Sequence, residues 1–318
     1  MRKVAVTGAS GFIGQALVAR ATELGAHTVS ITRAAPTESR SPGETHVVVD
    51  QTDRYALSRA MRGAEVVFHL AARTHQRDLG KGGALEAYRM ANVQVTRAAL
   101  LAAASAGVRR FVLMSSIKVN GERTANQPFR ADDPPAPEDH YGVTKLEAEI
   151  EARTIGARAG FEVVVMRSPL VYGAGVKGNL ARLMSLVGRG VPLPVGDCSN
   201  RRSLIGRTNL VDALLFAAHD DATAGRTFLI ADSCVSSREL VTAIAHALGR
   251  EPRMLVVPER LLRWIARPLG MAGEMDRLVG SLEIDPVSSL QAIGWRPRIE
   301  FHTEIQAMCS SYLLAEGS

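Results

Sequence analysis

Hydrophobic and polar positions are arranged in alternating blocks through the first two-thirds of the chain. Short apolar runs, apolar on both faces, are separated by longer segments whose apolar positions have helical spacing. Strands that are buried on both faces are typical of a parallel sheet covered by helices. The pattern therefore predicts an α/β fold with a doubly wound parallel sheet. The predicted strands are 3–8, 27–33, 45–50, 64–72, 110–116, 161–169 and 226–232, and the predicted helices are 12–24, 54–62, 84–107 and 140–159.

The local composition of the sequence changes near Val171, where glycine and proline become frequent in "VYGAGVKGN" and "GRGVPLPVGD". We expect a sheet domain of residues 1–170 plus about 207–232. A smaller C-terminal α/β substrate lobe is expected from 171–206 and 233–318, over the carboxyl edge of the sheet, where open α/β folds bind ligands. The apolar stripe Leu261, Leu262, Trp264 and Ile265 is expected to pack in this lobe or its lid rather than on a membrane.

A glycine-rich stretch, "VAVTGASGFIG", follows the first predicted strand and leads into the first predicted helix. Gly8, Gly11 and Gly14 allow a tight turn and let backbone N–H groups approach a pyrophosphate at the helix N-terminus. Because the strand and the helix flank the loop in the required order, the stretch predicts a dinucleotide-binding Rossmann domain.

The end of the second predicted strand bears on the type of dinucleotide. NAD-binding sites usually present an acid there, whereas this chain has "SITRAAP", with Thr32 and Arg33. An arginine can pair with the 2′-phosphate of NADP, so Arg33 favours NADP(H) over the alternative, NAD(H). Arg33 could also be a solvated side chain at the end of a strand, without a role in cofactor binding. Asp50, after the third strand, is expected either to contact the adenine side or to cap a helix.

Tyr141 stands in the first turn of the predicted helix 140–159, and Lys145 follows it by one turn on the same face. A free tyrosine has a pKa of about 10 and is a poor acid or base at neutral pH. We expect the ammonium group of Lys145 to lower that pKa, and Ser116, after the fifth strand, to hold a substrate oxygen. Tyr141 would then act as general acid/base, while Lys145 also holds the nicotinamide ribose.

Charge and composition limit the partners and the compartment. The net charge is +6, but basic residues are scattered singly and in pairs, so no nucleic acid partner is expected. No apolar run has the roughly 18 residues of a membrane span. The three cysteines lie far apart, and the strand pattern begins directly after Met1, so a cytoplasmic protein without disulfides is expected. The histidines have no metal-ligand spacing, and His69 is interpreted as a packed residue.

Several motifs distributed over nearly the whole chain resemble one family. They are "TGASGFIG", "HLAA", "ANVQVTRA", "SSIKVNGE", "YGVTK", "RSPLVYGAG", "RRSLIGRTNLVDAL" and "LQAIGWRP". Together they are similar to the extended short-chain dehydrogenase/reductase family, in its NAD-dependent epimerase/dehydratase branch. The resemblance implies a nucleotide-diphosphate sugar as substrate. It also implies a homodimer whose contact resembles a four-helix bundle built from 84–107 and 140–159.

The resemblance also implies roles for individual residues. It assigns catalysis to Ser116, Tyr141 and Lys145. In addition to Arg33, Tyr141 and Lys145, the residues implied to bind the cofactor are Gly8, Gly11, Phe12, Ile13, Gly14, Asp50, Ala71, Ala72 and Asn92. The residues implied to bind the substrate are Ser115, Ser116, Asn179, Arg202 and Arg277.

Two departures from the family pattern narrow the expected reaction. Asn120 stands where the family usually has tyrosine, and Leu170 where it usually has asparagine. Together with the motifs "SSIKVNGE" and "GVKGNLARL", these two departures make the sequence similar to a subgroup of the family from bacterial surface-polysaccharide pathways. We therefore expect an NADP(H)-dependent reductase of a 4-keto UDP-sugar of the UDP-4-keto-6-deoxy-N-acetylglucosamine type. The alternative is a 4-epimerase of a UDP-hexose or UDP-N-acetylhexosamine that retains NAD.

Two other functions are disfavoured. A dehydratase usually has an acid beside the serine, and "SSIKV" has none. A non-catalytic dinucleotide sensor has no need of Ser116, Tyr141 and Lys145 together.

Overall fold

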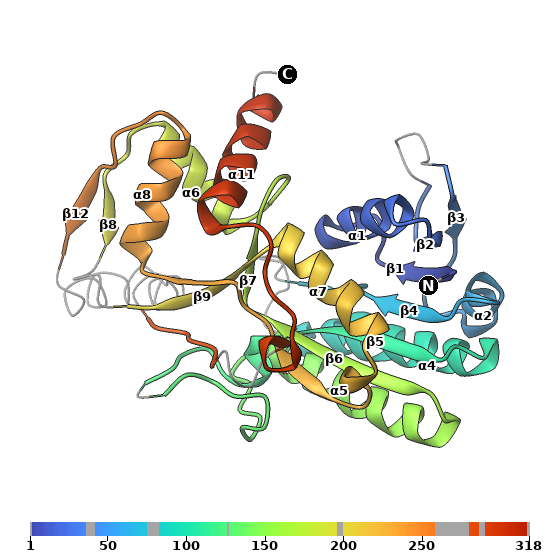
Figure 1. Ribbon diagram of the computed structural model, residues 1–318. Coiled ribbons are helices and arrows are strands. Elements are labelled where there is room, and N and C mark those ends of the chain that lie inside the picture. Colours follow the sequence, from blue (N-terminus) through green and yellow to red (C-terminus); the bar gives the residue numbers. More distant parts are fainter. Residues whose placement is uncertain are drawn as a thin grey trace.

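A computed structural model describes residues 2–35, 42–74, 83–125, 127–195, 200–257, 280–285 and 290–316 (Figure 1). In this part of the chain the larger sheet has seven parallel strands in the order β10-β6-β5-β4-β1-β2-β3. The order reverses between β1 and β4, which is the point where doubly wound sheets bind ligands. The predicted fold class is therefore confirmed. The strands are β1 (Lys3–Thr7), β2 (His27–Thr32), β3 (Glu44–Val48), β4 (Val66–His69), β5 (Arg110–Ser116), β6 (Glu162–Ser168) and β10 (Thr227–Leu229).

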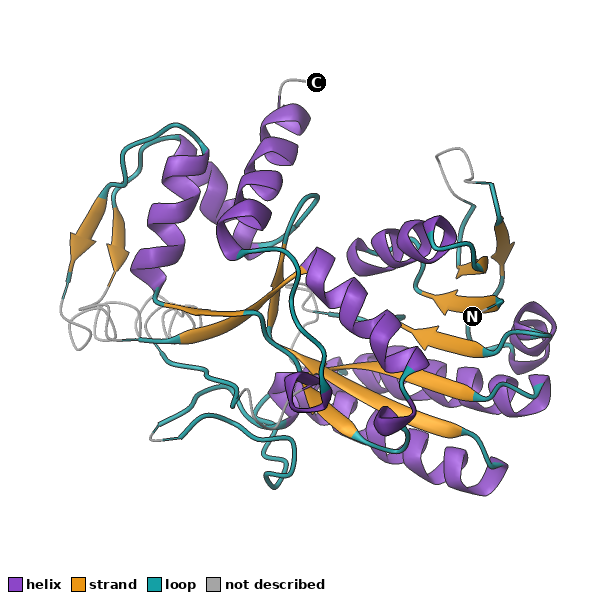
Figure 2. Ribbon diagram, in the orientation of Figure 1, coloured by secondary structure: helices purple, strands orange, loops and turns teal. Residues whose placement is uncertain are grey.

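Helices cover both faces of this sheet (Figure 2). On one face α1 (Phe12–Glu23) and α7 (Arg207–His219) pack against the outward side chains of the central strands. On the other face lie α2 (Arg54–Met61), α4 (Val95–Ala106) and α5 (His140–Ala159). Successive strand residues point to opposite faces, so both faces must be apolar, which explains the apolar strand runs in the sequence.

The segment predicted as one helix over 84–107 differs from that expectation. It consists of α3 (Ala84–Tyr88), a π-helical turn η1 (Arg89–Gln94) and α4. The widened turn contains Asn92, whose side chain is fully buried and bonded to neighbouring segments. Insertions of this kind are frequent at functional sites.

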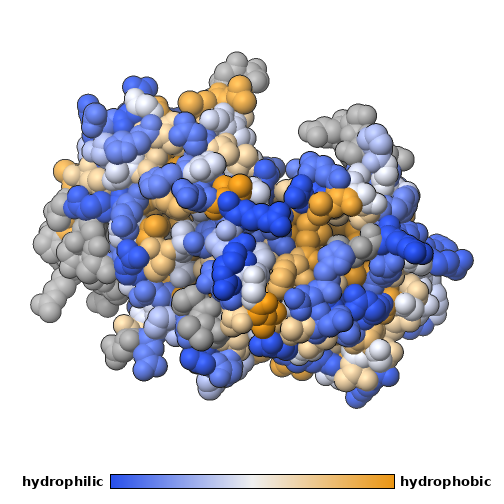
Figure 3. Space-filling view, in the orientation of Figure 1, coloured by the Kyte–Doolittle hydropathy of each residue, from blue (hydrophilic) through white to orange (hydrophobic). Residues whose placement is uncertain are grey.

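The smaller half of the protein contains two short sheets and three helices within the described residues. The strands are β7 (Leu170–Tyr172), β9 (Arg202–Gly206) and β11 (Ser233–Val235), with β8 (Leu193–Val195) paired to β12 (Met254–Val256). The helices α6 (Asn179–Gly188), α8 (Ser237–Ala247) and α11 (Phe301–Glu316) share one apolar cluster. In Figure 3 a notch separates the half carrying α8 and α11 from the half carrying α1.

The expected domain boundaries at 171, 207 and 233 stay predictions. The apolar stripe from Leu261 to Ile265 lies outside the described residues. No helix in the described ranges is both long and apolar enough to cross a membrane.

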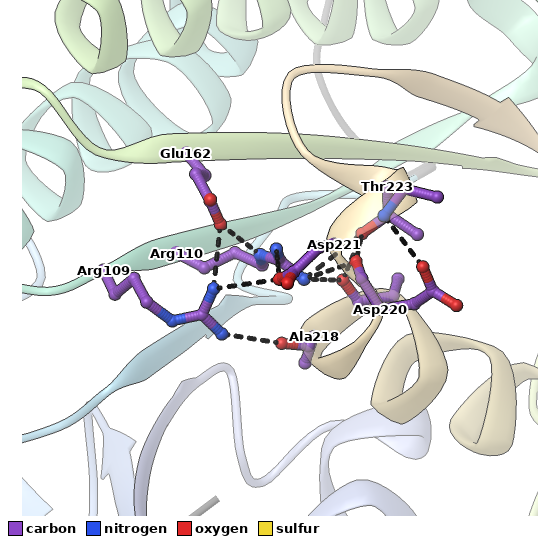
Figure 4. A network of polar contacts seen from close by, with 9 residues as sticks. Arg109, Arg110, Glu162, Ala218, Asp220, Asp221 and Thr223 are labelled. Atoms are coloured by element: carbon purple, nitrogen blue, oxygen red, sulfur yellow. Dashed lines mark hydrogen bonds and ion pairs between the residues drawn. The ribbon is translucent and has the colours of Figure 1, made fainter.

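A polar network at the amino edge of the sheet accounts for the basic pair Arg109 and Arg110 (Figure 4). The side chain of Arg110 has 0% exposure, and its Nε donates to Glu162 at 2.6 Å. Its Nη1 donates to the carbonyl oxygens of Ala217 at 3.0 Å and Asp220 at 2.8 Å, at the C-terminus of α7. Cations are stabilising at a helix C-terminus, so the network fixes α7 to β5 and β6. This arginine is structural, and it lies at the edge opposite the glycine loop.

Candidate active site

The glycine loop between β1 and α1 packs too closely for side chains. Gly8 has φ +71°, and a Cβ there would lie 2.7 Å from the backbone nitrogen of Ala71 in the loop after β4. A Cβ on Gly14 would lie 2.2 Å from the carbonyl oxygen of Gly8. The two loops at the switch point of the sheet are therefore in close backbone contact.

The N-terminus of α1 is suited to an anion. Its N-cap is Gly11, which has no side-chain cap hydrogen bond, and its first turn contains no acid. The first N–H groups of the helix and the positive end of its dipole are thus available to a ligand. The diphosphate of a dinucleotide fits this cradle, because backbone N–H groups at a helix N-terminus bind phosphate oxygens.

Ser116 and Tyr141 are brought together by the end of β5 and the start of α5. Asp139 caps α5 by accepting from the Gly142 N–H at 2.7 Å, which places Tyr141 in the first turn. The side chains of Ser116 and Tyr141 are hydrogen-bonded to each other. Lys145 lies one turn further along the same helix and is only 1% exposed. The three residues predicted for catalysis therefore share one region.

The protonation states differ from the sequence-based expectation. Burial and, to a smaller extent, the Asp139 carboxylate raise the pKa of Tyr141 to about 12, against the lowering effect of the hydrogen bond with Ser116. Burial also lowers the pKa of Lys145 to about 8, against the opposing charge of Glu149. A lysine with that pKa has lost its proton before such a tyrosine ionises. The pKa of Tyr141 is therefore raised in this structure and not lowered as expected, because burial is its largest cause and Asp139 acts in the same direction.

Ser115 has a different partner from the one expected. Its hydroxyl donates to Glu149 Oε1 at 2.6 Å, and it is 2% exposed. Glu149 also accepts two hydrogen bonds from Arg167, at 2.9 Å from Nε and 2.7 Å from Nη2. The structure thus places Ser115 in a buried polar network, and its contact with a substrate stays a prediction.

Asn120, one of the departures from the family pattern, belongs to the same network. Its Oδ1 accepts from Arg167 Nη1 at 2.9 Å, and its Nδ2 donates to the Arg130 carbonyl oxygen at 2.8 Å. Sequence reasoning missed the role of Glu149 and Arg167. The sequence did contain a signal for Glu149: it follows Lys145 by one helical turn, so the two side chains share a helix face.

Asn92 joins the cofactor side to the tyrosine helix. Its Oδ1 accepts from the Arg73 backbone N–H at 2.7 Å, and its Nδ2 donates to Thr144 Oγ1 at 3.1 Å. The amide therefore holds the loop after β4 against α5. Direct contact of Asn92 with a cofactor stays a prediction, as does contact by Ala72.

His69 at the end of β4 is a packed and satisfied residue, as interpreted from the sequence. Its Nδ1 bonds Thr7 Oγ1 at 2.8 Å, and its Nε2 bonds Thr96 Oγ1 at 2.9 Å. Burial lowers its pKa to about 3, with the positive charge of Lys145 acting in the same direction. The imidazole is therefore neutral at ordinary pH.

Two predicted cofactor residues lie at the edge of the site. Arg33 follows β2 and is exposed. Asp50 Oδ1 accepts from the Thr52 N–H at 2.9 Å and from its hydroxyl at 2.8 Å, and these bonds lower the pKa of Asp50. The helix that follows is capped by Asp53, not by Asp50. The roles of Arg33 and Asp50 at a cofactor stay predictions.

The predicted substrate residues of the smaller half are only partly described. Asn179 is exposed as the first residue of α6. Arg202 begins β9, and its Nη1 donates to the Gly280 carbonyl oxygen at 2.9 Å. Arg277 lies outside the described residues.

Comparison with known proteins shows the family of the chain. The profile of the "NAD dependent epimerase/dehydratase family" matches residues 4–231. A UDP-glucose 4-epimerase of Vibrio cholerae is 36% identical over 320 residues, covering 99% of this chain and 97% of its own length. MoeE5 in complex with UDP-glucose and NAD is 28% identical, with a TM-score of 0.78 over 99% of this chain and 100% of that one.

A third similarity concerns the fold alone. A UDP-glucuronic acid 4-epimerase from Bacillus cereus, in complex with NAD, has a TM-score of 0.78 at 20% identity and covers 98% of this chain and 99% of its own. Fold and glycine loop define an extended short-chain dehydrogenase/reductase. Within that class the chain belongs to the NAD-dependent epimerase/dehydratase family and is an enzyme of it.

Proposed function

We propose that the enzyme transfers a hydride between NAD(P) and carbon 4 of the sugar in a UDP-linked hexose or hexosamine. The observation that carries this proposal is the hydrogen-bonded pair Ser116 and Tyr141 at the carboxyl ends of the strands, with Lys145 buried one turn away. A dinucleotide seated on the N-terminus of α1 has its diphosphate at the switch point of the same sheet.

Each residue has a defined task in this proposal. Ser116 holds the substrate oxygen by a hydrogen bond, and Tyr141 gives a proton to that oxygen or takes one from it. Because the pKa of Tyr141 is raised to about 12, the phenol is a proton donor in the resting site. Lys145 holds the nicotinamide ribose, and the nicotinamide, when bound, supplies or accepts the hydride. The nucleotide diphosphate is assigned to Asn179, Arg202 and Arg277 in the smaller half.

Two reactions share this step, and each has its own support. The Vibrio cholerae relative, similar over nearly the full length, favours a 4-epimerase that oxidises and re-reduces the same carbon with retained NAD. The exposed Arg33 after β2, where an acid would favour NAD, instead favours an exchangeable NADP(H) and hence a 4-keto reductase. In both reactions the proton passes between Tyr141 and the oxygen on carbon 4.

We further propose that the enzyme is a homodimer through α4 and α5. These helices present an ion pair between Arg97 and Glu151 at 3.7 Å on their outer surface. Ile150 on α5 is 54% exposed, and Leu101 and Ile155 line a groove between the two helices. A second copy of the same helix pair would cover these apolar side chains in an isologous contact.

Replacing Tyr141 by phenylalanine tests the proposed chemistry. We expect turnover to fall by about 10²- to 10⁴-fold, since that is the contribution of a positioned general acid/base. NADH and NADPH titrations should give unchanged affinities. Turnover is measured as interconversion of UDP-glucose and UDP-galactose and of their N-acetylhexosamine counterparts, and as NADPH oxidation with UDP-4-keto-6-deoxy-N-acetylglucosamine.

Tyr88→Phe is the matched control, because the ring of Tyr88 lies 6.5 Å from that of Tyr141 and its hydroxyl bonds only weakly, at 3.4 Å, to the Thr74 carbonyl oxygen. It should change turnover by no more than a few-fold. Full activity in Tyr141→Phe would remove Tyr141 from the mechanism. Mass spectrometry of nucleotide released from the purified enzyme separates the two reactions: stoichiometric NAD indicates the epimerase, and an empty protein that prefers NADPH indicates the reductase.

A further inference from the structure

Arg207, the first residue of α7, is an arginine whose surroundings leave a buried donor unsatisfied. Its Nε is shielded from solvent and has no hydrogen-bond acceptor among the residues that the structure describes. Buried polar groups in proteins nearly always have a partner, and an unsatisfied one calls for an explanation. The guanidinium is nevertheless positioned: its Cζ lies 5.2 Å from the centre of the Phe12 ring.

The main chain on both sides of Arg207 is fixed by acids. The Gly206 N–H donates to Asp232 Oδ2 at 2.7 Å, and Thr208 donates to Glu304 Oε1 through its N–H at 3.3 Å and its hydroxyl at 3.2 Å. Glu304 is 4% exposed, so this carboxylate is already engaged at the start of α7. Glu304 therefore accepts hydrogen bonds from Thr208, although its charge also acts on Arg207, and the guanidinium lies over the ring of Phe12.

Phe12 connects Arg207 to the glycine loop. It is the first residue of α1, directly after the uncapped Gly11, so its ring lies beside N–H groups that are available to an anion. A guanidinium stacked on this ring stands at the same helix end as those donors. Arginine presents a planar fork of N–H groups that matches phosphate oxygens, and stacking on an aromatic ring holds the fork in place.

We propose that Arg207 binds an oxygen of a diphosphate at the junction of the glycine loop and α7. The inference rests on the proposed function, because it needs a dinucleotide on α1. The shared chemistry is a diphosphate, which both the dinucleotide and the nucleotide sugar carry. The dinucleotide is the expected source, since the ring under the guanidinium belongs to α1. Gly175, on the side of the smaller half, also comes close: a Cβ there would lie 3.7 Å from Nη1 of Arg207.

The test replaces Arg207 by glutamine and by lysine and measures binding of NADH, NADPH and UDP by titration calorimetry. A charge-assisted hydrogen bond to phosphate contributes enough that Arg207→Gln should weaken dinucleotide binding by about 10-fold or more. Arg207→Lys should recover only part of the loss, because an ammonium group keeps the charge but lacks the fork. The salt dependence of NADH binding should also become shallower in Arg207→Gln.

Arg226→Gln is the matched control. Arg226 also stacks on a phenylalanine, with its Cζ 5.0 Å from the Phe228 ring, but it precedes β10 at the amino edge of the sheet. This variant should bind all three nucleotides like the wild type. Circular dichroism melts of each variant verify that the fold is kept.

Each outcome bears on the proposal. Weaker NADH binding with unchanged UDP binding supports the dinucleotide as the source, and the reverse supports the nucleotide sugar. Unchanged affinity for NADH, NADPH and UDP in both Arg207 variants overturns the inference while leaving the proposed function intact. A wild-type protein that binds neither NADH nor NADPH refutes the proposed function instead.

Discussion

The buried pair of Glu149 and Arg167 gives a sharp prediction about stability. Both side chains are almost completely buried, with 0% exposure for Glu149 and 3% for Arg167. The Glu149 carboxylate accepts hydrogen bonds from Ser115, from two nitrogens of Arg167 and from Arg153 at 3.1 Å. Replacing Glu149 by glutamine removes the negative charge and one acceptor oxygen, and it places an amide NH₂ against donors.

The magnitude follows from what remains. Arg167 keeps a charge in the interior without a counter-charge, and breaking one side of a buried pair typically costs about 3–5 kcal/mol. We expect Glu149→Gln to reduce the free energy of unfolding by that amount, measured by urea denaturation followed by circular dichroism at pH 7. Arg167→Met should reduce the free energy of unfolding less in the Glu149→Gln variant than in the wild type. In that variant the guanidinium charge of Arg167 has already lost its partner.

Glu147 on the same helix offers a matched control. It forms a similar two-pronged pair with Arg89, at 3.1 Å and 2.8 Å, but the side chains are 31% and 42% exposed. Water screens such a pair, so Glu147→Gln should lose far less stability than Glu149→Gln. Equal losses in the two variants would refute the argument that burial gives the Glu149 pair its weight.

Two further predictions concern the cofactor side of the site. The pKa of His69 is lowered from 6.5 to about 3 in the folded protein. Between these pH values the unfolded protein binds one proton more than the folded protein. The free energy of unfolding should therefore fall by about 1.4 kcal/mol per pH unit as the pH drops below 6.5. Urea denaturation at pH 5 and pH 7 should show this loss in the wild type and not in His69→Gln, whereas an equal loss in both would assign it to other groups. Gly8→Ala should destabilise the fold and weaken NADH binding much more than the control Gly63→Ala. Both glycines have a positive φ, but only at Gly8 does backbone lie within 3 Å of the added Cβ. Denaturation and NADH titration of both variants check this, and equal effects would mean that the contact with Ala71 is not limiting.

The fold was predictable because its signals are local. Apolar runs on both faces and a glycine loop between strand and helix are properties of neighbouring residues, and the spacing of Tyr141 and Lys145 follows from helix geometry. The pKa of Tyr141 was not predictable, because burial depends on segments distant in the sequence. The partner of Ser115 was likewise hidden, since Glu149 is 34 residues away. The π-helical turn depends on bonds from Asn92 to Arg73 and Thr144, which no periodicity reports.

These long-range bonds form one connected path between the two halves of the candidate chemistry. Thr7, the last residue before the glycine loop, bonds His69, and His69 bonds Thr96 on α4. Thr96 in turn donates to the Asn92 carbonyl oxygen at 2.6 Å, and the Asn92 side chain donates to Thr144, whose hydroxyl contacts the Tyr141 carbonyl oxygen at 3.1 Å. The bonds from Thr7 to Thr144 are buried, where an unmade hydrogen bond is costly, and the last bond, from Thr144 to Tyr141, is partly buried. The path therefore connects the start of the glycine loop to the first turn of α5, which carries Tyr141. Neutral His69 donates from one ring nitrogen and accepts at the other, and both partners are hydroxyl groups that can take either role.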